Sequence, residues 1–218
     1  SRTVLRGERG RKASDLPDER KNKMKLETED YEKRRNICDF FKWMHLTSLA
    51  IKSDSDSDKL YFERTGNIKK FFEEAVPLGL LALRKYCLGS EIFIQCFTGN
   101  QPYDGIISVP IELAENEERK IEVTTTETND STLRRQAMSR NGSIWLTGPV
   151  YRDKENKRRI ITECGAADVL EEEKKLVDLA FSRFKAKAEK GYDSNTDFLV
   201  YLDCARTPRD DVRVLPGP

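Results

Sequence analysis

The sequence has few of the side chains on which metal centres and nucleophilic sites commonly depend. Among 218 residues there is a single histidine, His45, which leaves no His-rich metal centre and no Ser-His-Asp triad of obvious spacing. The five cysteines (positions 38, 87, 96, 164 and 204) are odd in number and include no C-x-x-C pair. We therefore expect reduced, mostly buried thiols rather than a disulfide scaffold or a zinc ribbon. A metal ion in this protein would be bound by oxygen atoms.

Long apolar runs and an excess of charge of one sign are also missing. No segment approaches the roughly 18 apolar residues that span a bilayer, and the stretch SRTVLRGERGRK at residues 1–12 contains no apolar signal segment. We therefore expect a cytoplasmic protein without a membrane partner. The formal net charge is +1, which gives no overall electrostatic indication of nucleic-acid binding.

Positive charge does gather in one segment. Residues 1–25 contain nine Lys or Arg and four Asp or Glu, and such a segment is either a solvated, disordered arm or one that contacts phosphate groups. The patterning divides the remainder into an N-terminal helix with a polar linker, an α/β core and a C-terminal tail (26–64, 65–206 and 207–218). A chain of this length is expected to build one hydrophobic core.

The hydrophobic patterning predicts an α/β fold. Apolar residues at helical spacing mark three helices (29–50, 65–89 and 168–191), and apolar runs bounded by turn residues mark six strands (91–97, 103–109, 120–126, two within 143–164, and 196–204). The last strand follows a crossover helix and is almost wholly apolar, so we expect it to lie parallel to an earlier strand in a central position. The predicted architecture is a mixed central β-sheet flanked by helices, with an N-terminal helical extension.

Two neighbouring predicted strands each carry a carboxylate, although strand interiors disfavour Asp and Glu. Asp104 begins YDGIISV, and Glu122 lies inside KIEVTTT. Strand alternation puts Lys120, Glu122 and Thr124 on one side of the sheet, about 7 Å apart in succession. In a hairpin, Asp104 and Glu122 would meet on that face near the same end. The pair is either a site or a turn residue beside one solvated acid.

These residues and the order of elements resemble the restriction-endonuclease-like, PD-(D/E)XK phosphodiesterases. Here "PYD" ends in Asp104 and "EVT" begins with Glu122, within about residues 65–204. The resemblance implies an α-β-β-β-α-β core that binds Mg²⁺ or Mn²⁺ through Asp104 and Glu122, with a further Glu from the leading helix. "FEE" offers Glu73 or Glu74 for that position. Such ions neutralise phosphate charge and activate water.

The chain departs from the family pattern at one position, because Thr124 stands where the motif has Lys. Lys120, on the same predicted face, or Gln136, in LRRQAM, would have to take its place beside the attacking water. Alternatively, Lys120 is an ordinary solvated side chain. Arg134 and Arg135 either contact phosphates or are surface charges of a helix.

Three functions follow as expectations from these observations. The first is metal-dependent phosphodiester hydrolysis on nucleic acid. The second is a catalytically inactive nuclease-fold module for nucleic-acid binding or protein interaction, which the missing Lys favours. The third is a protein-interaction domain in which the basic arm and the helix at 29–50 contact a protein partner or a second copy of the chain. The sequence does not decide between an enzyme and a binding module.

Overall fold

A computed structural model describes residues 24–54, 56–88, 91–109, 118–145, 148–166 and 168–202. Its helices are α1 (Thr28–Tyr31), α2 (Ile37–Ser53), α3 (Ser57–Glu63), α4 (Gly66–Lys70), the π-helical turn η1 (Phe71–Ala75), α5 (Val76–Lys85), α6 (Asn129–Asn141) and α7 (Val169–Ala188). Its strands are β1 (Arg35–Asn36), β2 (Phe93–Cys96), β3 (Gly105–Ser108), β4 (Glu118–Thr125), β5 (Val150–Arg152), β6 (Ile160–Thr162) and β7 (Thr196–Tyr201). The basic arm and the C-terminal tail lie almost entirely outside the described residues.

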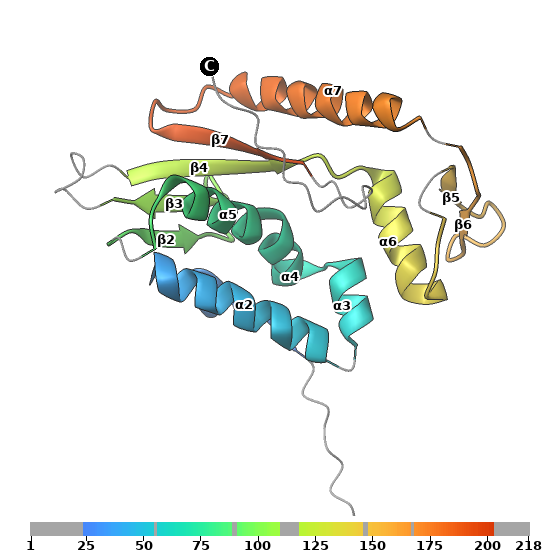
Figure 1. Ribbon diagram of the computed structural model, residues 1–218, viewed down its shortest axis with the longest axis horizontal. Coiled ribbons are helices and arrows are strands. Elements are labelled where there is room, and N and C mark those ends of the chain that lie inside the picture. Colours follow the sequence, from blue (N-terminus) through green and yellow to red (C-terminus); the bar gives the residue numbers. More distant parts are fainter. Residues whose placement is uncertain are drawn as a thin grey trace, which may run out of the picture.

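A five-stranded mixed sheet forms the centre of the protein, in the order β1-β2-β3-β4-β7. The first four strands pair antiparallel, and β7 pairs parallel with β4. Helices flank this sheet, with α7 along the β7 side and α2 on the β2 side (Figure 1). The predicted α/β class, with its mixed sheet and preceding helical region, is confirmed.

The last strand is parallel as expected, but its predicted central position is wrong. In the described sheet β7 lies at an edge, beside β4 only. Its side chains are all half-buried rather than buried. The apolar run is explained by partial cover: Phe198 packs edge-on against Phe184 of α7 and against Tyr192. An apolar strand therefore needs only partial shielding at this edge.

The second predicted helix is three consecutive helical segments, α4, η1 and α5. Pro77 lies in the first turn of α5, where its missing N–H is tolerated, and the π-helical turn immediately precedes that segment. The wider turn shifts the register of the helix, so Leu80 and Leu83 are exposed. Leu78 and Ala82 enter the core instead.

The N-terminal helix begins later than predicted because its first residues join the sheet. β1 pairs with β2, and Asn36 then caps α2 by accepting a hydrogen bond from the Asp39 amide at 2.9 Å. Aromatic contacts of Trp43 with Phe40 and Phe71 tie α2 to the leading helix of the core. The segment at 26–64 is therefore packed onto the sheet domain.

The main hydrophobic core lies between α2, the α4–α5 segment and one face of the sheet. Ile94, Ile107, Ile121 and Val123 contribute the sheet side of that core. Of the described cysteines only Cys96 is buried, so the expectation of mostly buried thiols is wrong, although all four are free (38, 87, 96 and 164). No helix in the described ranges has the length and apolar character needed to cross a membrane.

Candidate active site

Asp104 and Glu122 are brought side by side by the pairing of β3 with β4. Gly105 pairs with Ile121 in this antiparallel ladder, and continuing the register by one residue places Asp104 opposite Glu122. The Asp104 amide donates to the Ile121 carbonyl at 2.9 Å. The Asp104 carboxylate accepts from the Val123 amide at 2.8 Å. The hairpin expected from the sequence therefore forms and brings the two acids together.

Gly105 allows this end of β3 to approach the helix above it. A Cβ atom at this position would lie 2.4 Å from Cδ2 of Leu78 and 3.0 Å from the carbonyl oxygen of Gln95. Leu78 belongs to the buried face of α5, so a side chain at 105 would push the strand away from the helix. The glycine thus fixes the position of its neighbour Asp104.

Lys187 supplies an ammonium group to Glu122 from α7, the helix between β6 and β7. Its Nζ donates a close hydrogen bond to Oε1 of Glu122. The Glu122 side chain is 7 % exposed and that of Lys187 27 %. Ile121 and Val123 point into the core on the opposite face, so strand alternation directs Glu122 toward α7.

Glu74 joins the same group of charges from the π-helical turn. Its carboxylate accepts from the buried Tyr31 hydroxyl at 3.3 Å and interacts electrostatically with Asp104 and Lys187. Glu74, Asp104, Glu122 and Lys187, hereafter the site cluster, therefore come from four different elements or loops. Three carboxylates and one ammonium are concentrated at one place.

Burial shifts the protonation equilibria of this cluster. Desolvation, followed by the nearby Asp104 charge, raises the pKa of Glu74 to about 7. Desolvation also raises the pKa of Asp104, opposed by the Val123 amide and Lys187. The pKa of Lys187 is lowered by desolvation, against the attraction of Asp104 and Glu74. Such shifts from burial and close charges are typical of functional sites.

The other candidate from "FEE", Glu73, belongs to a separate group. Its pKa is raised to about 7 by burial and by its interaction with Glu127. Glu127 accepts a close hydrogen bond from Arg135 and a 2.6 Å bond from the Thr132 hydroxyl. Glu73, Glu127, Thr132 and Arg135, hereafter the Glu127 cluster, join the π-helical turn to α6. The structure does not bring Glu73 to Asp104 and Glu122.

The residues expected to replace the motif lysine lie in other contacts. Lys120 donates to Asp193 at 2.6 Å in an exposed ion pair, and Gln136 accepts from Arg152 at 2.8 Å. Thr124 is half-buried on the Glu122 side of β4. Neither Lys120 nor Gln136 shows a contact with the acids of the site cluster in the described structure.

The two arginines proposed for phosphate contacts are engaged within the fold. Arg134 is buried and donates to the carbonyl oxygens of Trp145 and Gly148. Arg135 binds Glu127 and donates to the Phe62 carbonyl at 3.4 Å. These contacts hold α6 to its surroundings, and the phosphate role of Arg134 and Arg135 stays a prediction.

The site cluster suits an ion that needs few protein ligands. No three His, Cys, Asp or Glu side chains in the described part of the chain are placed to bind a metal ion together. Mg²⁺, however, commonly uses one or two carboxylates, with water and substrate phosphates completing its coordination. Asp104 and Glu122 offer hard oxygen ligands of that kind.

Lys187 was missed because it is distant in sequence from the acids it joins. The available signal was the basic end of the helix at 168–191, followed by a strand expected to be parallel. A crossover helix of this kind packs over the strands it connects, so its basic residues were candidates to meet Glu122. Tyr31 and Glu127 gave no comparable signal.

Comparison with known proteins adds no family assignment. No protein-family model, curated protein or solved structure matches the chain. The protein is a mixed α/β protein with a five-stranded mixed sheet, and its function has to be argued from the site cluster.

Proposed function

We propose that this protein is a restriction-endonuclease-like phosphodiesterase that hydrolyses nucleic acid with the help of Mg²⁺ or Mn²⁺. The proposal depends mainly on one observation, the contact between Lys187 and Glu122 beside Asp104. The family pattern requires two acids and an ammonium group, and Thr124 cannot provide the last. Lys187 supplies that chemical group from α7, so the chain has the required set despite the missing motif residue.

Each residue of the site cluster has a role in this reaction. Asp104 and Glu122 would hold the metal ion, and Glu74 would bind one of its waters. When bound, such an ion lowers the pKa of water and offsets the negative charge of the phosphate. Lys187 would orient the attacking water and stabilise the charge that develops on phosphate oxygens. Attack of water at phosphorus breaks the bond to the leaving oxygen, which takes up a proton.

The same contacts also favour a second function, a nuclease-fold module that binds nucleic acid without cleaving it. Lys187 already neutralises Glu122, and one oxygen of Asp104 is satisfied by the Val123 amide. The acids are therefore partly compensated within the protein. We place hydrolysis first because a structural ion pair alone does not require Asp104 and Glu74 to be buried close to it.

Hydrolysis of bis(4-nitrophenyl) phosphate and of labelled DNA and RNA, with Mg²⁺, Mn²⁺ or EDTA, tests the proposal directly. Metal-dependent cleavage is expected for the wild type, and Asp104→Asn, Glu122→Gln and Lys187→Ala are each expected to reduce it by about 100-fold or more. Lys185→Ala is the matched control, because Lys185 is exposed on the same helix. It should retain the wild-type rate.

A rescue variant separates catalysis from stability. Thr124 and Glu122 lie on the same face of β4, two residues apart, so Lys at position 124 would reach the acid. Thr124→Lys combined with Lys187→Ala should recover part of the activity that Lys187→Ala loses. Metal-independent cleavage, or cleavage unaffected by Lys187→Ala in a folded protein, would contradict the proposed mechanism. Binding of DNA or RNA without cleavage would favour the inactive module.

A further inference from the structure

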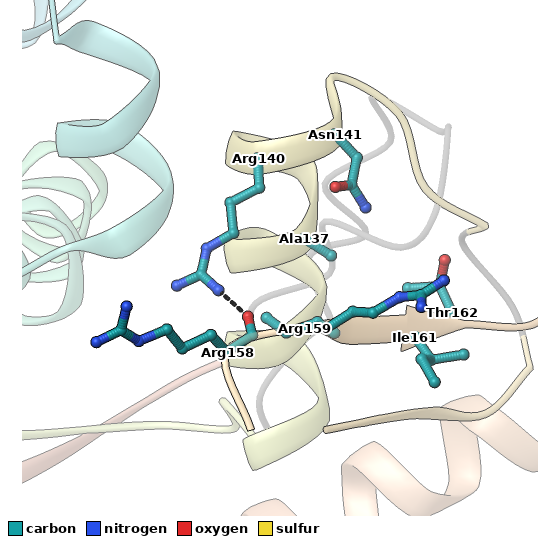
Figure 2. Close-up of a pocket in the computed structure, with 8 residues that line it drawn as sticks. Ala137, Arg140, Asn141, Arg158, Arg159, Ile161 and Thr162 are labelled. Carbon is teal, nitrogen blue, oxygen red and sulfur yellow. Dashed lines mark hydrogen bonds between the residues drawn. The ribbon is translucent and has the colours of Figure 1, made fainter. Parts of the chain in front are cut away.

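A pocket of about 360 Å³ lies between α6 and the β5–β6 hairpin, in a region that the proposed chemistry does not use. Its lining includes Arg140 and Asn141 from the end of α6, and Arg158, Arg159 and Thr162 from the hairpin. Figure 2 shows the side chains of Arg140 and Arg158 extending to the same side of α6, while Arg159 reaches across the opposite side. Three arginines therefore border the pocket, with the guanidinium groups of Arg140 and Arg158 on one side of α6 and that of Arg159 on the other (Figure 2).

Acidic side chains do little to compensate this charge. The pocket lining contains no Asp or Glu. Arg159 forms a long ion pair with Asp153, at 4.0 Å, and Asp153 also accepts hydrogen bonds from the amides of Glu155 and Asn156. Arg140 donates to the Arg158 backbone carbonyl, which fixes its position without neutralising it. The local charge is therefore strongly positive.

This chemistry matches a phosphate group. Guanidinium groups present a planar set of N–H donors that pair bidentately with phosphate oxygens. The Asn141 amide and the Thr162 hydroxyl add neutral hydrogen-bonding groups to the same lining. Holding three like charges at one pocket costs Coulomb energy, which an anionic ligand would offset.

The pocket is firmly connected to the elements that carry the site cluster. α6 follows β4 after residues 126–128, and Arg183 of α7 donates to the Thr125 carbonyl and, at 2.5 Å, to the Glu127 carbonyl in that connection. The 13 residues of α6 span about 20 Å. Successive phosphates of one strand are about 3.4 Å apart along the duplex axis, so the length of α6 corresponds to about six nucleotides.

We infer that Arg140, Arg158 and Arg159 around this pocket contact backbone phosphates of the nucleic acid, several nucleotides away from the phosphate that is cleaved. This inference rests on the proposed function for the identity of the ligand, since a free phosphate or a nucleotide has the same anionic group. The pocket would position the substrate and take no part in bond breaking.

Salt-dependent binding provides the test. Affinity for a fluorescent 20-base-pair DNA duplex and for 20-nucleotide single-stranded DNA and RNA is measured by anisotropy in EDTA, from 50 to 300 mM NaCl. Arg158→Ala combined with Arg159→Ala should weaken binding at least tenfold at the lowest salt. It should also reduce the slope of log K against log salt by about 2, as expected for two lost phosphate contacts.

Two control variants distinguish a phosphate contact from general effects. Lys33→Ala with Lys42→Ala removes the same charge from exposed positions before and within α2, and should leave the slope unchanged. Arg158→Lys with Arg159→Lys keeps the charges and should restore most of the slope. An unchanged slope in the alanine variant, or equal losses in the α2 control, would overturn the inference. Wild-type binding of inorganic phosphate or nucleotides only would also overturn the nucleic-acid assignment.

The two proposals fail in distinguishable ways. Bis(4-nitrophenyl) phosphate is too small to reach the pocket and the site cluster together, so its hydrolysis reports on the site cluster alone. Hydrolysis without the expected loss of oligonucleotide binding in the alanine variant would retain the proposed function and reject the pocket. The expected binding losses without any hydrolysis would retain the pocket and reject the catalytic proposal.

Discussion

Glu73 and Glu74 are neighbours in sequence, yet they enter two groups of charges whose carboxylates have different partners. In the Glu127 cluster, Arg135 and Thr132 both donate to one carboxylate, and the side chains of Arg135 and Glu127 are only 15 % and 10 % exposed. In the site cluster, Lys187 is more exposed and faces three acids. The π-helical turn carries both glutamates and directs them apart.

This difference indicates different purposes for similar residues. A buried acid with several donors holds helices together, and its loss is felt as instability. In the site cluster three acids accompany one ammonium group, and a cation would offset this excess of negative charge. We therefore expect substitutions in the Glu127 cluster to affect folding and those in the site cluster to affect chemistry.

The largest expected effect comes from Arg135→Ala, which would leave Glu127 buried without its charge partner. We expect the free energy of unfolding to fall by about 3–5 kcal/mol, as measured by urea denaturation. Lys69→Ala is the control, since Lys69 also approaches Glu73, at 3.7 Å, but is 57 % exposed. Its loss should cost less than about 1 kcal/mol. If Arg135→Ala and Lys69→Ala lowered the free energy of unfolding equally, the expected difference between buried and exposed charge partners would be contradicted.

A second difference should be visible in the pH dependence of stability. The pKa of Glu73 is raised from 4.5 to about 7, so between these values the folded state keeps a proton that the unfolded chain releases. The contribution of Glu73 to the free energy of unfolding is therefore fully present below about pH 4.5 and is lost as the pH rises to about 7. The pKa of Glu127 is lowered to about 2, which affects stability only below about pH 4.5.

Glu73→Gln should consequently flatten the decline between pH 4.5 and 7.5. The gain over the wild type at pH 7.5, relative to pH 4.5, is expected to be about 3 kcal/mol. Urea denaturation at both pH values measures it. Glu74 has a pKa raised in the same direction, so a residual slope should remain. Parallel pH profiles for the variant and the wild type would contradict the raised pKa of Glu73.

In the site cluster, Asp104→Asn should stabilise the protein while it abolishes hydrolysis. The substitution keeps an acceptor for the Val123 amide and removes a charge that burial disfavours. We expect a gain of about 1 kcal/mol near pH 7.5, detected as a higher melting temperature. Asp178→Asn, at an exposed position of α7, should change neither stability nor rate. A clearly lower melting temperature for Asp104→Asn would indicate that the site cluster stabilises the fold instead of serving the proposed chemistry.

The smallest effect is expected for Lys120→Ala. Lys120 lies on the Glu122 face of the strand but forms an exposed ion pair with Asp193. Such pairs contribute little to stability, so the denaturation midpoint should stay unchanged. The rate of bis(4-nitrophenyl) phosphate hydrolysis should remain within about twofold of the wild type. A large loss of activity would restore Lys120 as the replacement for the motif lysine.

Local patterns were sufficient to predict the sheet and the pairing of its acids. The runs around Ile107 and Val123, with a short connection between them, led to the β3–β4 hairpin, and its register followed from placing apolar residues in the core. The edge position of β7 was not predictable in this way. An apolar run indicates that a strand is shielded from solvent but not which element shields it. In β7, Phe184 and Tyr192 cover Phe198 without a second neighbouring strand.

The partners of charged residues were the part that the sequence could not provide. Glu73 and Glu74 look equivalent in "FEE", and only the geometry of the π-helical turn separates them. Arg134 and Arg135 resemble surface charges, whereas Arg134 is buried. Lys187 and Glu122 are 65 residues apart, and local residue spacing does not predict a contact over that separation. Charge pairing depends on the final packing of elements, which hydrophobic periodicity determines only approximately.

The parallel pairing of β7 with β4 also has a consequence for the order of folding. Both acids of the β3–β4 hairpin can come together through local contacts as soon as β4 has been synthesised. Lys187 and β7 follow much later in the chain, and Lys120 pairs with Thr196 across that separation. Non-local strand pairing of this kind forms slowly, and chains fold from the N-terminus during synthesis. The nascent protein therefore carries its acids before its ammonium group, and the site cluster is completed only when the last helix and strand dock.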